Sequence, residues 1–214
     1  MFETLMAKTF IILTCSLAIA WFSCMFAARL YDTALQTQDY SKVKKYNIWA
    51  LIVFIGSFIM MMFMRNLFPL NMLLMVLFTA ASGFSLGIYV IAYKETAQKA
   101  LSLTVLTTFL TGLVAMYSGL DFEWLGNFLF IGLIIVIIYS IIRIFFSIRG
   151  RRFIAGLSVL IFTGYLLFDF NRLSKLKGIV AANTWDNALS FAINIYLDII
   201  NLFISLMNLM SSNN

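Results

Sequence analysis

The chain has 214 residues, of which 63% are hydrophobic and only 11% are charged, and its formal net charge is +6. Soluble domains are about one quarter charged, so this composition excludes a soluble globular domain. The chain contains no His and only 2 Cys, which argues against a zinc, haem or copper site and gives no reason to expect a cofactor. Its apolar runs are continuous rather than alternating, which indicates spanning helices and not a β-barrel.

Seven apolar runs are long enough to cross a bilayer, and they predict an all-α integral membrane protein with a single seven-helix domain over residues 1–214. In chain order they cover residues 5–28, 46–64, 70–93, 100–117, 125–146, 153–171 and 187–210. The first run is too long for the apolar part of a cleaved signal peptide, so we expect it to remain as a spanning helix. Residues 29–45 are predicted to form the longest connection, and the short remaining loops favour antiparallel neighbours.

Small residues indicate where these helices approach closely. Gly83 and Gly87 form a G-x-x-x-G pattern in the third run, and Gly156 and Gly164 lie two turns apart in the sixth. Small side chains let two helix backbones come into contact within a membrane. We therefore expect the third and sixth runs to pack tightly against neighbours at these positions.

The basic residues lie in the loops, so the positive charge is a signal of membrane topology rather than of nucleic-acid binding. Ten Lys and Arg lie near the ends of the first, third and fifth runs or in the loops after them, against five on the opposite side. The two groups are Arg29, Lys42, Lys44, Lys45, Lys94, Lys99, Arg143, Arg149, Arg151 and Arg152, and Lys8, Arg65, Arg172, Lys175 and Lys177. This distribution favours an outside N-terminus and a cytoplasmic C-terminus.

The last apolar run carries a polar stripe with a carboxylate at its middle. The stripe follows helical spacings of three and four residues, which place its members on one face. Its members are Asn187, Ser190, Asn194, Asp198, Asn201, Ser205 and Asn208. An ionised Asp198 inside a bilayer costs about 2.5–3.5 kcal/mol on insertion scales, so it needs a partner, a wet cavity or a proton.

Asp169, in the sixth run, is the second carboxylate embedded in apolar sequence. We expect Asp169 and Asp198 to face each other across the last two helices. Two adjacent carboxylates in a low dielectric cannot both ionise readily, so they would share a proton, act as a pH sensor and could also bind a cation. Arg65, at the end of the second run, is expected on the same side of the membrane as the end of the sixth run. It could form an ion pair with the two aspartates and keep them in a closed arrangement.

Each of these residues also has a structural interpretation. Asp169 could form a local ion pair with Arg172, and Arg65 could extend to the lipid headgroups. Asn194, Asn201 and Ser205 could support Asp198 or serve only as hydrogen bonds between helices. On ideal helices Asp169 and Asp198 would differ in depth within the membrane by roughly 10 Å. A tilt of one helix would have to compensate for this difference.

Three stretches, in this order, give the chain its likeness to a known family. They are L-D-F-E-W-L-G-N-F-L-F-I-G-L-I from Leu120, I-F-T-G-Y-L-L-F-D-F-N-R-L from Ile161, and N-I-Y-L-D-I-I-N-L-F-I-S-L-M from Asn194. With the seven-run layout, they resemble the Bax inhibitor-1 family, also called the transmembrane Bax inhibitor motif family, and its bacterial members in particular.

The resemblance implies a bundle of six helices around a central seventh, which in some members is a pH-sensitive calcium leak. In such members two aspartates form the sensor and an Arg latches them, and Asp169, Asp198 and Arg65 occupy those positions here. This chain departs from relatives at Gly119 and Leu120, where basic residues are common. Relatives are inferred to have an inside N-terminus, which disagrees with the charge count.

Two functions are therefore expected. The first is a calcium leak channel controlled by protonation of the aspartate pair; the alternative is a regulatory protein that binds a membrane-bound protease or another membrane partner. An aspartyl protease is disfavoured, because neither aspartate has the G-x-G-D context of intramembrane proteases. The short chain suggests a bacterial inner membrane.

Overall fold

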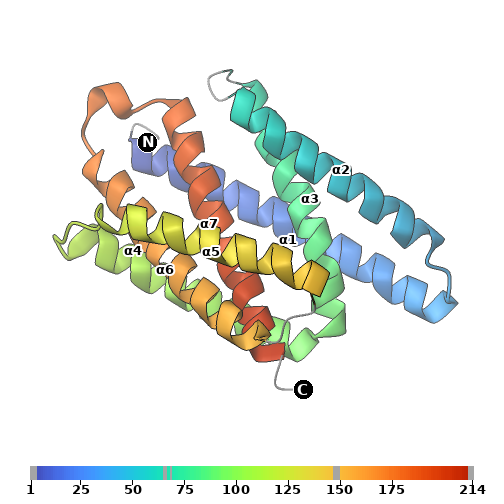
Figure 1. Ribbon diagram of the computed structural model, residues 1–214. Coiled ribbons are helices and arrows are strands. Elements are labelled where there is room, and N and C mark those ends of the chain that lie inside the picture. The colour runs from blue at the N-terminus through green and yellow to red at the C-terminus, as the bar shows by residue number, and fades with distance from the viewer. Residues whose placement is uncertain (1–3, 65–66, 68, 147–149, 212–214) are drawn as a thin grey trace. The chain divides into compact units, whose positions relative to one another are not determined.

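The computed structural model describes residues 4–64, 67, 69–146 and 150–211, and every regular element in those residues is helical (Figure 1). The elements are α1 (Leu5–Thr37), α2 (Ser41–Phe63), α3 (Leu70–Ala92), α4 (Lys94–Tyr117), α5 (Leu125–Phe146), α6 (Arg151–Lys175), the short 3-10 helix η1 (Val180–Ala182) and α7 (Trp185–Ser211). Within the described residues, 7 helices are long and apolar enough to cross a membrane. The predicted all-α membrane fold is confirmed, while the placement of six helices around a seventh stays a prediction.

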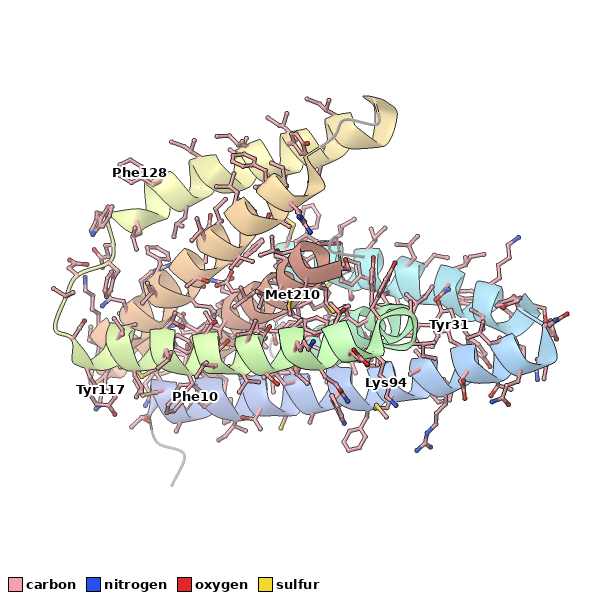
Figure 2. All side chains as sticks on the ribbon, turned by 90° about the horizontal axis from the view of Figure 1, so that it is seen from below. Phe10, Tyr31, Lys94, Tyr117, Phe128 and Met210 are labelled. Atoms are coloured by element: carbon pink, nitrogen blue, oxygen red, sulfur yellow. The ribbon has the colours of Figure 1, made fainter. Side chains whose placement is uncertain are left out.

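Apolar side chains cover the outer faces of these helices, which is the pattern that lipid requires. Phe128 of α5 projects outward and is 67% exposed (Figure 2). Exposed apolar surface on this scale would drive aggregation in water, whereas lipid tails accept it without cost. The described chain is thus built to be solvated by a bilayer.

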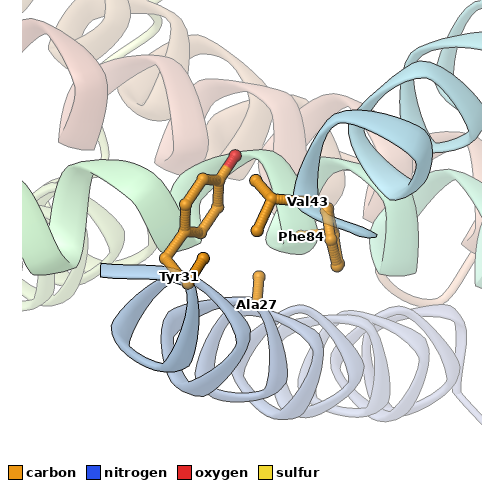
Figure 3. Close-up of a cluster of buried hydrophobic side chains, with 5 residues drawn as sticks. Ala27, Tyr31, Val43 and Phe84 are labelled. Atoms are coloured by element: carbon orange, nitrogen blue, oxygen red, sulfur yellow. The ribbon is translucent and has the colours of Figure 1, made fainter. Parts of the chain in front are cut away.

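The prediction of a long polar connection at residues 29–45 was wrong, because α1 continues to Thr37 and α2 already begins at Ser41. Tyr31 and Ala34 of α1 are buried in one cluster with Val43 of α2 and Phe84 of α3 (Figure 3). This packing stabilises the helix beyond its apolar run. At 33 residues, α1 is about 50 Å long and exceeds a hydrocarbon core of about 30 Å.

The first of two compact units comprises Met1–Lys94 and Ile179–Ile193. In this unit α3 packs against both α1 and α2. A Cβ atom built on Gly83 would lie 2.6 Å from the Ala20 Cα, and one on Gly87 would lie 2.9 Å from the Ala28 backbone nitrogen. The predicted close approach at the G-x-x-x-G pattern is therefore confirmed, and its partner is α1.

The second unit comprises Glu95–Gly178 and Asn194–Asn214, so it holds α4, α5, α6 and the later part of α7. The helices α5 and α6 pack together, and a Cβ on Gly164 would lie 2.6 Å from a methyl carbon of Leu129. Gly112 of α4 faces the Phe170 ring of α6. A Cβ on Gly156 would meet no described atom within 4 Å, so only Gly164 of the predicted pair makes a close contact.

The glycine contact between α1 and α3 gives a direct test of the first unit. We expect Gly83→Ala to lower the free energy of unfolding by about 1–3 kcal/mol, because the new methyl group would meet the Ala20 backbone. Gly56→Ala is the matched control, since that Cβ meets no described atom within 4 Å and should stabilise α2 by about 0.5–1 kcal/mol. Unfolding of the purified protein in detergent measures both. Equal stability of the two variants would contradict the packing.

Candidate functional site: an aspartate pair between two helices

Asp169 of α6 and Asp198 of α7 are buried carboxylic side chains, with exposed fractions of 4% and 7%. Both belong to the second unit. Asp198 lies within a strongly buried part of α7, where Ile195, Tyr196 and Leu202 are 0% exposed. The apolar residues around Asp198 on α7 are buried with it, so its carboxyl group has little contact with solvent.

The structure brings the two carboxyl groups into hydrogen-bonding contact with each other. The expected 10 Å offset in depth therefore does not separate them. The Oδ2 atom of Asp198 is buried and, among the described residues, has no hydrogen-bond partner. A buried polar oxygen without a partner is costly, so this atom is the point in the site that is ready to accept a proton or a cation.

Two further side chains of α6 act on the pair. Tyr165, one turn before Asp169, lies within electrostatic range of both carboxyl groups. Arg172 attracts Asp169, and its guanidinium carbon lies 5.3 Å from the centre of the Phe168 ring. Asp169 thus lies within electrostatic range of Arg172 and in contact with Asp198.

The predicted latch and the supporting polar residues of α7 differ in burial and in their contacts. Arg65 lies outside the described residues, so its latching role stays a prediction. Asn194 is exposed and Asn201 is half-buried. Ser205 is buried, and its hydroxyl donates to the backbone oxygen of Asn201 at 2.6 Å, within its own helix. A buried hydroxyl satisfied in this way needs no partner on another helix.

The beginning of α7 is held by other contacts, all within the first unit. The Asn71 side chain is 2% exposed and its Nδ2 donates to Asp186 Oδ1 at 2.9 Å. Lys8 Nζ donates to the backbone oxygen of Asn183 at 3.0 Å and lies 5.5 Å from the centre of the Trp185 ring. These contacts fix the start of α7 separately from the aspartate pair.

Sequence reasoning missed a polar side chain on α6. Asn171, two residues after Asp169, is 4% exposed and hydrogen-bonds to the segment between α4 and α5. The signal was visible, because an amide stands beside the carboxylate in F-D-F-N-R, but we placed the end of the sixth span at that residue. The helix in fact continues to Lys175.

Chemically, a pair of buried carboxyl groups can hold one proton between them or offer oxygens to a cation. Calcium usually takes six to eight oxygen ligands. Among the described residues, no group of three or more His, Cys, Asp or Glu could hold a metal ion.

Comparison with known proteins places the chain in a family. Residues 3–214 match the sequence profile of the family described as inhibitor of apoptosis-promoting Bax1. The chain belongs to the Bax inhibitor-1 family. The match runs across all seven spans, which agrees with the resemblance seen in its three motifs.

Relatives occur in plants and bacteria. Protein LIFEGUARD 1 of Arabidopsis thaliana is 32% identical over 152 residues, which are 67% of this chain and 61% of that protein. Protein LIFEGUARD 4 of the same plant is 31% identical over 172 residues, or 76% of this chain and 66% of that protein. An uncharacterized protein of Helicobacter pylori is 28% identical over 181 residues, or 82% of this chain and 76% of that protein. The chain thus spans about three fifths of the length of LIFEGUARD 1.

The contact between the carboxyl groups predicts a pH-dependent stability. Removing the shared proton leaves two adjacent negative charges in an apolar site, so we expect the melting temperature to fall by a few degrees toward alkaline pH. Asp169→Asn and Asp198→Asn should each weaken this dependence, because the carboxyl group that remains has no neighbouring negative charge to repel it. Thermal unfolding in detergent between mildly acidic and alkaline pH measures it.

Asp121→Asn is the control for this experiment. Asp121 is exposed between α4 and α5, and its hydrogen bond with Lys175 holds the pKa of that carboxyl below its ordinary value. Asp121 therefore stays ionised across the assay, and its electrostatic contribution would be lost only at more acidic pH. The variant should keep the wild-type dependence. The same slope in all four proteins would show that the pair does not titrate in this range.

Proposed function

We propose that this Bax inhibitor-1 family protein is a pH-sensitive calcium leak channel in which Asp169 and Asp198 control ion passage. The observation that carries the proposal is a hydrogen-bonded pair of buried carboxyl groups, one of which has an oxygen without a described partner. Ionisable residues inside a membrane protein commonly mark ion pathways and proton relays.

The mechanism follows from competition for the same oxygens. With a shared proton, the pair carries one negative charge and its hydrogen bond joins α6 to α7. Without that proton, the two carboxylates repel each other and together attract a divalent cation. Protons and calcium therefore bind to the same oxygens, and the rate of calcium passage changes with pH.

The proposal concerns transport rather than catalysis. Asp169 follows Leu-Leu-Phe and Asp198 follows Ile-Tyr-Leu, instead of the glycine-rich context of intramembrane aspartyl proteases. We propose a bacterial inner membrane as the location, and the relative in Helicobacter pylori supports this choice.

Calcium flux into liposomes tests the function. We expect the wild-type rate to change several-fold between pH 6 and pH 8, roughly the range over which a buried carboxyl group exchanges its proton. Asp169→Asn and Asp198→Asn should each strongly reduce the pH dependence, because neither variant can form the proton-sharing pair, while Asp121→Asn should retain it. The readout is a calcium-sensitive dye enclosed in the vesicles.

Unchanged flux and an unchanged pH response in both amide variants would refute the proposal. Absence of flux from every protein, together with a membrane protein that co-purifies in stoichiometric amount, would instead favour regulation of a membrane-bound protease or a similar partner.

A further inference from the structure

The segment between α4 and α5 is fastened to α6 by the side chain of Asn171. Its Nδ2 donates to the backbone oxygens of Ala115 at 3.3 Å and Leu120 at 3.0 Å, and its Oδ1 accepts from the Phe122 N–H at 3.2 Å. A carboxylate could not donate to the two carbonyls, and a hydroxyl could not reach all three groups. The site therefore requires an amide.

The turn that Asn171 holds has its own local structure. Gly119 has a φ of 71°, a left-handed conformation that favours glycine, and it redirects the chain at the end of α4. The Leu120 N–H donates to Ser118 Oγ at 3.2 Å, and the Glu123 N–H donates to Asp121 Oδ1 at 2.9 Å. These bonds present the Leu120 oxygen and the Phe122 N–H as a fixed target for the amide.

One turn after Asn171, Lys175 reinforces the same attachment. Its Nζ lies 2.6 Å from Asp121 Oδ1 and 3.1 Å from Glu123 Oε1. All three side chains are solvent-accessible, so this ion pair contributes little energy by itself. The buried amide of Asn171 is therefore the principal attachment, and Lys175 is an accessory to it.

Asn171 and Asp169 lie on nearly opposite sides of α6, because two residues correspond to about 200° of rotation. The segment bound to Asn171 thus restrains how α6 can rotate about its own axis. A carboxyl carbon about 5 Å from that axis moves by roughly 2.5 Å in a rotation of about 30°, enough to break a hydrogen bond. The orientation that satisfies Asn171 is also the one that directs Asp169 toward Asp198.

We propose that Asn171 is a positioning residue for the aspartate pair: its hydrogen bonds to the α4–α5 segment hold α6 in the rotation that places Asp169 against Asp198. The inference rests on the proposed function only in its physiological meaning, since the contact between the carboxyl groups can be measured without ion flux. Loss of the amide frees α6 to rotate and weakens the coupling of the pair.

The charged and titratable groups around the pair come from more than one element. On α6 they are Tyr165 and Arg172, and on α7 the group is Asp198 itself. The segment between α4 and α5 carries Asp121 and Glu123, which face Lys175. The charges of α4 itself, Lys94, Glu95 and Lys99, lie in its first turns, at the opposite end from Ala115. A change made at Asn171 alters none of these charges directly.

The test is a pH titration of the full-length protein followed by the infrared absorption of protonated carboxyl groups. The band of the pair is assigned by its loss in the double variant Asp169→Asn/Asp198→Asn. We expect Asn171→Leu, which keeps the volume and removes the hydrogen bonds, to shift the midpoint of this band by about half a pH unit or more. Asn171→Gln, which keeps an amide, should shift it less. Faster hydrogen exchange at the Phe122 N–H would verify that the attachment is broken.

Asn71→Leu is the matched control, because it makes the same substitution at an equally buried asparagine that binds Asp186 in the first unit. A general loss of stability would affect this variant too, but its midpoint should equal that of the wild type. An unchanged midpoint in folded Asn171→Leu would overturn the inference. If Asn171→Leu does not fold, Asn171→Ala decides, since it also removes the hydrogen bonds: a shifted midpoint supports the positioning role and an unchanged one overturns it.

Calcium flux from the same preparations separates the two proposals. A midpoint that shifts in Asn171→Leu, in a protein that passes no calcium, would support the positioning role and refute the channel. A wild-type protein with pH-dependent flux and a midpoint unchanged in Asn171→Leu would support the channel and refute the positioning role.

Discussion

The burial of two carboxyl groups against each other is the constraint on which this part of the protein depends. Each would cost several kcal/mol if it were ionised alone in an apolar interior. Contact between them lets the two carboxyl groups share one proton, and Arg172 attracts Asp169 from the same helix. The cost becomes tolerable only while α6 and α7 keep their relative position, so the chemistry of the pair and the packing of the helices are linked.

Helix α6 is the element that carries this link. One face presents Asp169, and the other presents Asn171 to the segment between α4 and α5. Its contacts with α5 are also close, since a Cβ on Gly126 would lie 2.9 Å from the Phe168 ring. Because interiors packed in this way change between discrete arrangements rather than deform continuously, a rearrangement at one face of α6 affects the other.

Both units contain close glycine contacts and a buried asparagine, and the second also contains the buried carboxyl pair. In the first unit, α1 and α3 meet backbone to backbone at Gly83 and Gly87, with aromatic and aliphatic packing around Tyr31 and Phe84. In the second, buried polar groups on α6 hold the pair and the α4–α5 turn. Close backbone contact gives a rigid scaffold, whereas a buried network with a titratable member can respond to its surroundings.

Sequence alone determined the seven spans, the G-x-x-x-G contact and the two embedded aspartates. Hydropathy and helical periodicity can be read from neighbouring residues, and a bilayer accepts only segments that satisfy their own backbone hydrogen bonds. It could not show that α1 continues to Thr37, since that extension depends on packing of Tyr31 with Val43 and Phe84. The sequence led us to expect that Asp169 faces Asp198, but only the tertiary structure gave the contact between their carboxyl groups and showed that Asn171 binds the turn at Leu120. Those contacts join residues far apart in the chain, and no local pattern specifies which faces of two helices will meet.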